Sequence, residues 1–215
     1  MDIVERIFAA RGLTAETRAL FLSPNYSRMH DPFLLPDMAA AVKRLVSAHT
    51  LQEKITIYGD YDIDGLTATT LLLDAFASFG FQDVDAFIPN RFVEGYGLTV
   101  DAVEKIAATG AKLIVTVDCG SLSHIEVTRA NELGVNVIVT DHHNVAEIPP
   151  PAVATINPKR KDHNYPFIDL AGVGVAFKLV QALQTKLVLI PPGQEKWLLY
   201  RVAPGSVCDI VTVVY

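Results

Sequence analysis

Cysteine is scarce in this 215-residue sequence: Cys119 and Cys208 are the only two, and they lie far apart. That spacing excludes the paired cysteines of a zinc ribbon and the dense disulfide framework of a small secreted domain. Two ordinary thiols are typical of a reducing compartment, so we expect a cytoplasmic protein.

Long apolar runs and an excess of basic residues are also missing. No run reaches the roughly 20 residues that cross a bilayer, and the N-terminus lacks a basic segment followed by an apolar one. We therefore expect no membrane partner and no signal peptide. With 18 basic and 24 acidic residues the net charge is −6, which argues against coating nucleic acid through general positive charge. A local basic groove or a metal-mediated grip on phosphates is compatible with this balance.

From residue 54 onward, short apolar segments alternate with helical ones. Continuous apolar strands separated by helices predict an α/β fold, a Rossmann-like and mostly parallel sheet flanked by helices on both faces. We expect residues 1–50 to form an N-terminal helical segment packed on a core domain of residues 51–215. The predicted strands are 54–58, 84–88, 112–117, 135–140 and 152–156. The predicted helices of the core are 66–79, 99–109, 122–133 and 175–187.

Three aspartates at alternate positions follow the first predicted strand: Asp60, Asp62 and Asp64. Carboxylates this close repel one another, and a divalent cation offsets the repulsion. Carboxylate oxygens suit Mg²⁺ or Mn²⁺. An EF-hand loop is disfavoured, because its twelfth position would be Leu71 rather than glutamate and a β-type run precedes it. A solvated acidic turn is the remaining alternative.

Acids and imidazoles also follow other predicted strands. Asp118 follows 112–117, and Asp141, His142 and His143 follow 135–140. Ligands of such sheets bind beyond the carboxyl ends of the strands, so we expect these side chains to converge. Imidazole with carboxylate suits Mn²⁺, Zn²⁺ or Fe²⁺, and additional carboxylates shift the preference toward Mn²⁺ or Mg²⁺.

Several motifs together resemble the DHH phosphoesterase family, and most closely its exonucleases that digest single-stranded DNA from 5′ to 3′ in repair and recombination. The main ones are Gly59–Gly65 (GDYDIDG), Val117–Gly120 (VDCG) and Thr140–His143 (TDHH). Further similar segments are Ile88–Arg91, Glu94–Gly97, Ile156–Pro158, Leu170–Val175 and Val207–Ile210. The resemblance covers about residues 54 to 211.

The resemblance implies a catalytic domain with two Mn²⁺ or Mg²⁺ ions and single-stranded DNA as substrate. The implied metal ligands are Asp62, Asp64, Asp118, His142 and Asp209. Asp118 would bridge the ions, and Asp118, His142 and His143 form the implied catalytic group. His143 would contact the scissile phosphate or assist metal binding, and Asp60 and Asp141 would support the site. The family's C-terminal DHH-associated and oligonucleotide-binding domains are not in this sequence.

Other residues are candidates for holding phosphate or DNA. Arg91, beside Asn90, could hold a phosphate oxygen, and Tyr96 could stack on a base. The basic run after the last predicted strand, with Asn157, Lys159 and Arg160, could track a DNA backbone. The glycines that open the helix near 175, Gly172 and Gly174, could offer their amides to a phosphate. The alternatives are a surface arginine, a packed tyrosine, a solvated loop and close helix packing.

The sequence therefore predicts a two-metal phosphodiesterase, with Asp118 and His142 within about 8 Å of each other. Two alternatives stay open: a hydrolase of short oligonucleotides or cyclic dinucleotides, and a non-catalytic DNA- or partner-binding fragment. The complete set of acids and histidines argues against loss of catalysis.

Overall fold

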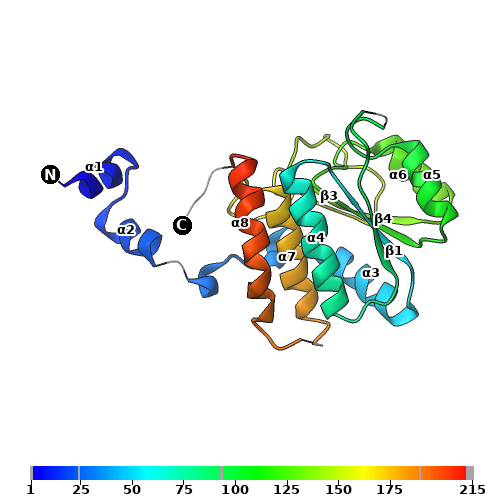
Figure 1. Ribbon diagram of the computed structural model, residues 1–215, viewed down its shortest axis with the longest axis horizontal. Helices are drawn as coiled ribbons and strands as arrows, with labels where there is room; N and C mark the ends of the chain where they lie inside the picture. Colours follow the sequence, from blue (N-terminus) through cyan, green and yellow to red (C-terminus); the bar gives the residue numbers. More distant parts are fainter. Residues whose placement is uncertain (1, 24, 93, 189, 212–215) are drawn as a thin grey trace.

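The computed structural model describes residues 2–23, 25–92, 94–188 and 190–211. Within these residues five parallel strands form one sheet in the order β2-β1-β3-β4-β5 (Figure 1). The strands are β1 (Ile55–Gly59), β2 (Val84–Phe87), β3 (Leu113–Val117), β4 (Asn136–Thr140) and β5 (Ala154–Ile156). The predicted α/β fold is confirmed, and each predicted strand is present with its ends shifted by at most two residues.

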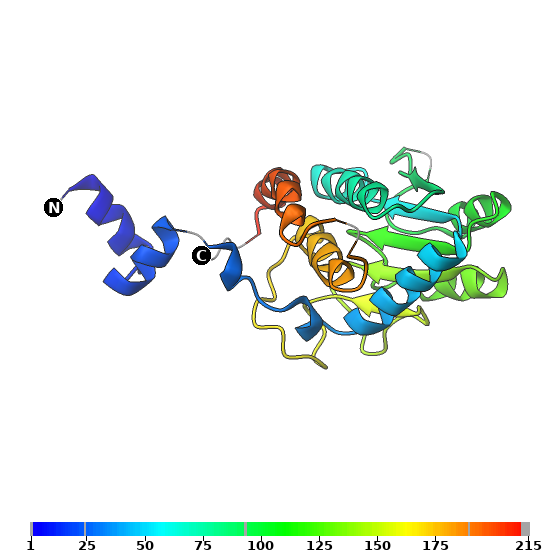
Figure 2. The ribbon, with the colours of Figure 1, turned by 90° about the horizontal axis from the view of Figure 1, so that it is seen from below.

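Helices cover both faces of the sheet, which explains why β1 and β3 are buried along their whole length. Side chains alternate along a strand, so Ile57 faces one apolar cluster and Tyr58 the other. Helix α8 packs on α4 and α7 rather than directly on the sheet (Figure 2). The layer with α8 contains α3 (Met38–Leu51), α4 (Ile63–Ser78), α7 (Gly172–Gln184) and α8 (Leu199–Cys208); the other contains α5 (Val100–Ala108) and α6 (His124–Glu132).

The N-terminal segment divides into two parts. Helix α3 packs on α7 and β5, whereas α1 (Ile3–Ala10) and α2 (Ala15–Leu22) lie apart from the layered body in both views. These two helices pack on each other through Phe8 and Phe21, whose ring centres are 6.4 Å apart. Three short 3-10 helices complete the described elements: η1 (Tyr26–Arg28), η2 (Pro32–Leu34) and η3 (Gln194–Leu198).

Helix ends differ from the sequence prediction where side chains cap them. Helix α4 begins at Ile63 rather than 66, because the Asp62 carboxylate accepts a hydrogen bond from the Gly65 amide at 2.9 Å. Helix α7 begins at Gly172 rather than 175. Helix α8 was not predicted; it contains Pro204, a residue that disfavours a helix interior. The sequence of residues 210–215 is apolar and β-prone, but residues 212–215 lie outside the described residues.

The strand order places a topological switch point between β1 and β3. Strand β2 lies along one edge of β1, and the chain then crosses over so that β3 lies along the other edge of β1. In open α/β sheets, ligands bind at such a point beyond the carboxyl ends of the strands. None of the helices in the described parts of the chain has the length and apolar character needed to cross a membrane.

Candidate metal centre

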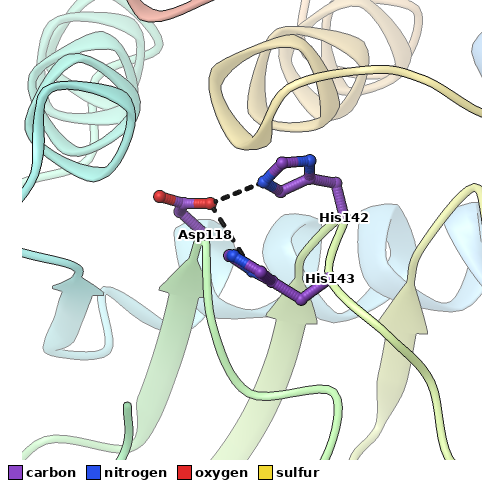
Figure 3. A group of neighbouring side chains, drawn as sticks. All are labelled: Asp118, His142 and His143. Carbon is purple, nitrogen blue, oxygen red and sulfur yellow. Dashed lines mark ion pairs between the residues drawn. The ribbon is translucent and has the colours of Figure 1, made fainter. Parts of the chain in front are cut away.

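Side chains from the ends of β1, β3 and β4 meet at this switch point. Asp118 Oδ1 lies 3.1 Å from His142 Nε2 and 3.8 Å from His143 Nδ1 (Figure 3). The predicted proximity of Asp118 and His142 is therefore confirmed, well inside the limit of about 8 Å.

The convergence extends to every predicted metal ligand. Three groups of side chains each place one ligand atom per residue within 4.8 Å of the others; Asp118 belongs to two of the groups and His142 to two. The groups are Asp118–His142–His143, Asp64–His142–Asp209 and Asp60–Asp62–Asp118. Overlapping groups of carboxylates and imidazoles are the arrangement expected for a pair of divalent cations.

Asp64 is buried and fixed by the first turn of α7. Its carboxylate accepts hydrogen bonds from the amides of Gly172 at 2.6 Å and Val173 at 2.9 Å. These amides and the helix dipole stabilise its negative charge, although burial still raises the pKa of Asp64 above its ordinary value. The expectation that Gly172 offers its amide to a substrate phosphate is wrong, because this amide is already paired.

Gly172 and Gly174 instead permit close packing. A Cβ on Gly172 would lie 2.6 Å from Asp118 Oδ1, too close for any side chain, and one on Gly174 would lie 3.3 Å from Leu170. The packing alternative therefore explains both glycines, and Gly172 lets α7 reach the centre.

Asp118 combines burial with an unusual backbone. Its φ is +62°, in the left-handed region that aspartate tolerates better than most residues, and its amide donates to the Thr140 carbonyl at 3.0 Å. Burial, followed by repulsion from Asp64 and Asp62, raises the pKa of Asp118 to about 10.

Two buried ligand atoms fit a metal ion. Within the described part of the chain, Asp118 Oδ1 and His142 Nε2 have no hydrogen-bond partner. Burial, and then the positive charge of His143, lower the pKa of His142, which keeps the imidazole neutral with a free lone pair. Its Nε2 also lies 3.7 Å from Asp64 and 3.6 Å from Asp209. A neutral imidazole facing carboxylates suits a divalent cation.

Asp141 holds the two histidines in position through hydrogen bonds to its carboxylate. Its Oδ1 accepts from the amides of His142 and His143 and from His143 Nδ1 at 2.9 Å, and its Oδ2 accepts from the Ser121 amide. Burial acts to raise the pKa of Asp141, but these hydrogen bonds outweigh it and hold the pKa below its ordinary value. The supporting position predicted for Asp141 matches this geometry.

His143 differs from His142 in exposure and charge. Its side chain is 46% exposed, and the hydrogen bond to Asp141 is the main reason that its pKa rises to about 9. A charged imidazole donates hydrogen bonds and does not ligate a metal. Both predicted roles of His143, contact with the scissile phosphate and assistance to metal binding, stay predictions.

Two of the residues predicted to contact DNA instead pair with other groups inside the protein. Asn157 is completely buried, and its amide group donates to Ser121 Oγ at 2.8 Å and to the His143 carbonyl at 3.0 Å. Arg160, whose side chain is 9% exposed, pairs with Asp37 and Asp162. The predicted DNA contacts of Asn157 and Arg160 are therefore wrong. Lys159 is exposed, and its contact with DNA stays a prediction.

The loop between β2 and α5 approaches the centre from the other side. The Arg91 guanidinium lies 5.2 Å from the centre of the Tyr61 ring, and the Tyr96 hydroxyl lies 3.3 Å from His143 Nδ1 and 3.4 Å from Nε2. The Asn90 side chain accepts from the Phe92 amide, so it shapes the loop. The predicted substrate contacts of Asn90, Arg91 and Tyr96 stay predictions.

Gly205 belongs to the site, although the sequence analysis missed it. A Cβ there would lie 2.5 Å from Thr67 Oγ1, 2.7 Å from Val173 Cγ1 and 3.0 Å from Asp64 Oδ1. Its small size lets α8 approach α4 and α7, and Asp209 follows one helical turn later at the end of α8. The available signal was a glycine four residues before the implied ligand Asp209.

Comparison with known proteins relates this geometry to a family. The model of the DHH family, N-terminal domain, matches residues 54–200. The single-stranded-DNA-specific exonuclease RecJ of Bacillus subtilis (strain 168) is 42% identical over 210 residues, which are 97% of this chain and 26% of that protein. RecJ of Escherichia coli (strain K12) is 41% identical over 219 residues, 97% of this chain and 37% of that protein. The chain thus spans between a quarter and two-fifths of the length of these relatives.

Solved structures agree with the sequence comparison. A crystal structure of exonuclease RecJ bound to manganese is 37% identical, with a TM-score of 0.71, and the match covers 82% of this chain and 44% of that one. RecJ from Thermus thermophilus in complex with Mn²⁺ is 32% identical, with a TM-score of 0.72, over 94% of this chain and 28% of that one. The similarity to RecJ proteins is the one expected from the motifs.

Gly205→Ala should weaken metal binding. The added methyl group pushes α8 outward and carries Asp209 away from His142, so we expect Mn²⁺ affinity to fall by about 10- to 100-fold, as when support for a ligand is lost. Titration calorimetry with Mn²⁺ measures this, with Ser206→Ala on the same helix as control. Equal affinity in Gly205→Ala and wild-type protein would contradict the placement of Asp209.

Asp118→Asn should change how the stability of the metal-free protein depends on pH. The folded-state pKa of Asp118, about 10, exceeds the unfolded value near 4. The stability that the protonated Asp118 allows is therefore complete below pH 4 and is lost progressively as the pH rises from about 4 to about 10. Asparagine cannot ionise, so at pH 8 in EDTA we expect its Tm to exceed the wild-type Tm by at least about 2–4 °C, which corresponds to roughly 1 kcal/mol. Thermal melts from pH 5 to 9 test this; parallel curves for the two proteins would contradict it.

Proposed function

Because this chain belongs to the DHH family, we propose that it binds two Mn²⁺ or Mg²⁺ ions and hydrolyses phosphodiester bonds of single-stranded DNA from the 5′ end. The observation that carries the proposal is the set of overlapping ligand groups around Asp118 and His142. The relatives named as single-stranded-DNA-specific exonucleases support the substrate, and the manganese-bound RecJ structures support the metal.

The ligand groups divide between the two ions. Asp64, His142 and Asp209 would hold one ion, Asp60 and Asp62 would lie on the side of the other, and Asp118 would serve both. When bound, such a pair lowers the pKa of a water molecule and stabilises charge on the phosphate oxygens. We assign this domain to residues 51–215, with residues 1–50 as its helical lead-in.

His143 and its neighbours would act on the phosphate. Asp141 holds His143 through Nδ1, which leaves Nε2 to donate a hydrogen bond to a phosphate oxygen in the protonated form. Such a donor stabilises the charge that develops during displacement. The Tyr96 hydroxyl borders the same imidazole edge and would fix its orientation. Arg91 extends the positive charge along the rim of the site.

The short-substrate alternative has one observation in its favour. The basic run after β5 loses Arg160 to internal ion pairs, so less positive charge is left to hold a long polyanion. This favours hydrolysis of short oligonucleotides by this chain alone, by the same metal chemistry.

Asp118→Ala and His143→Ala should separate metal binding from catalysis. Loss of the shared carboxylate should abolish both Mn²⁺ binding and hydrolysis, because both ions depend on it. Loss of the His143 donor should lower kcat by about 10²- to 10³-fold, the effect of removing one donor to a developing oxyanion, while metal content is retained. Metal analysis and hydrolysis of a 5′-labelled single strand measure the two effects. An equal loss of Mn²⁺ in both variants would show that the assigned roles are wrong.

This chain should show little preference for long strands. With a net charge of −6 and Arg160 paired internally, we expect kcat/KM for a short oligonucleotide and for a long single strand to agree within about threefold, without processive digestion. Product ladders from the two substrates with Mn²⁺ provide the measurement. Processive digestion with a strong preference for the long strand would instead show a complete DNA groove within these residues.

A further inference from the structure

The loop between β2 and α5 carries an aromatic side chain that lies almost entirely in solvent. Phe92 is 94% exposed, the highest value among the large hydrophobic residues of the described chain. Single exposed apolar residues are common on protein surfaces, so the position of Phe92 decides whether the exposure has a function.

Local contacts hold the loop in place. The Asn90 side chain accepts a hydrogen bond from the Phe92 amide at 3.0 Å, and the Asn90 amide donates to Glu94 at 2.9 Å. Glu94 in turn pairs with Lys105 of α5 at 2.8 Å. The Phe92 ring therefore extends into solvent from a turn that these hydrogen bonds and the ion pair to α5 stabilise.

Residues on both sides of Phe92 lie beside the metal centre. Arg91 stacks over Tyr61, which stands in sequence between Asp60 and Asp62. Tyr96 places its hydroxyl beside His143. Figure 1 shows this loop at the same end of the molecule as the first turn of α4, where the centre lies. Phe92 is thus an exposed aromatic ring at the rim of the site, next to an exposed arginine.

We propose that Phe92 stacks on a nucleobase of the strand whose phosphate lies at the metal centre. The proposal rests on the proposed function and adds a base-binding position to it. Every base has an aromatic face, so stacking on phenylalanine tolerates any sequence. In a duplex both faces of a base are covered by its neighbours, so a stack on Phe92 requires a base freed from its own stack. Phe92 therefore favours single strands over duplexes.

Phe92→Ala tests the proposal, because removing an exposed ring leaves the fold intact. Trp197→Ala is the matched control: Trp197 is 78% exposed and lies in η3, which precedes α8, whereas Asp209 follows the other end of that helix. The probe is a fluorescein-labelled oligothymidylate with Mn²⁺, and fluorescence anisotropy measures Kd before hydrolysis proceeds. We expect Phe92→Ala to weaken binding by about 5- to 100-fold, the range for one base on an aromatic ring, and Trp197→Ala to change it less than about twofold.

A second set of probes identifies the stacked base. Each oligothymidylate carries one abasic site, moved stepwise from the 5′ end. At one position the missing base should weaken binding to the wild-type protein as much as Phe92→Ala does, and should have no further effect on the variant. This loss of additivity is the signature of a direct contact.

Three outcomes overturn the proposal. Phe92→Ala could bind as tightly as wild type, or the protein and base deletions could add at every position; either removes the stacking while leaving the proposed hydrolase in place. A wild-type chain that binds Mn²⁺ but neither binds nor cleaves single-stranded DNA would overturn the stacking together with the proposed substrate. Equal Tm and metal content in Phe92→Ala and wild type show that the comparison concerns the ring alone.

Discussion

The burial of several carboxylates side by side is the constraint on which the rest of this structure depends. Asp60, Asp64 and Asp118 are each at most 3% exposed and lie in one cluster with His142. Buried charges without partners cost several kcal/mol each. The chain offsets part of this cost by aiming the first amides of α7 at Asp64. A divalent cation supplies the partner that remains missing, so affinity for metal follows from the same burial.

Backbone geometry brings these charges together. Asp118 adopts a left-handed conformation directly after β3, which turns its carboxylate toward β4 and His142. Such strain persists only where the surrounding structure enforces it, and it is concentrated at functional sites. Gly172 and Gly205 remove the side chains that would otherwise hold α7 and α8 away from the cluster. The metal centre therefore depends on the close approach of α7 and α8 as much as on its ligands.

The parts of the site that local sequence pattern determines were predicted well. Apolar strands followed by acids were enough to place Asp118 beside His142. Asp209 entered only by resemblance, because α8 contains Pro204 and its sequence predicts a helix poorly. The predictions for Arg160 and Asn157 failed for a different reason: the partners Asp37 and Ser121 are distant in the sequence, and pattern alone does not reveal tertiary pairing. Capping of α7 by Asp64 is non-local in the same way.

These corrections change how the substrate would be held. With Arg160 paired internally, the side of the site near β5 offers less charge than the sequence suggested, and the chain as a whole is acidic. Attraction for phosphate would then be local, through the metal ions, His143 and Arg91. Phosphate contacts cannot distinguish a single strand from a duplex, since both present the same backbone groups. Selection for single strands would then have to act on the bases, and the loop between β2 and α5 carries the aromatic side chains, Phe92 and Tyr96, proposed for that contact.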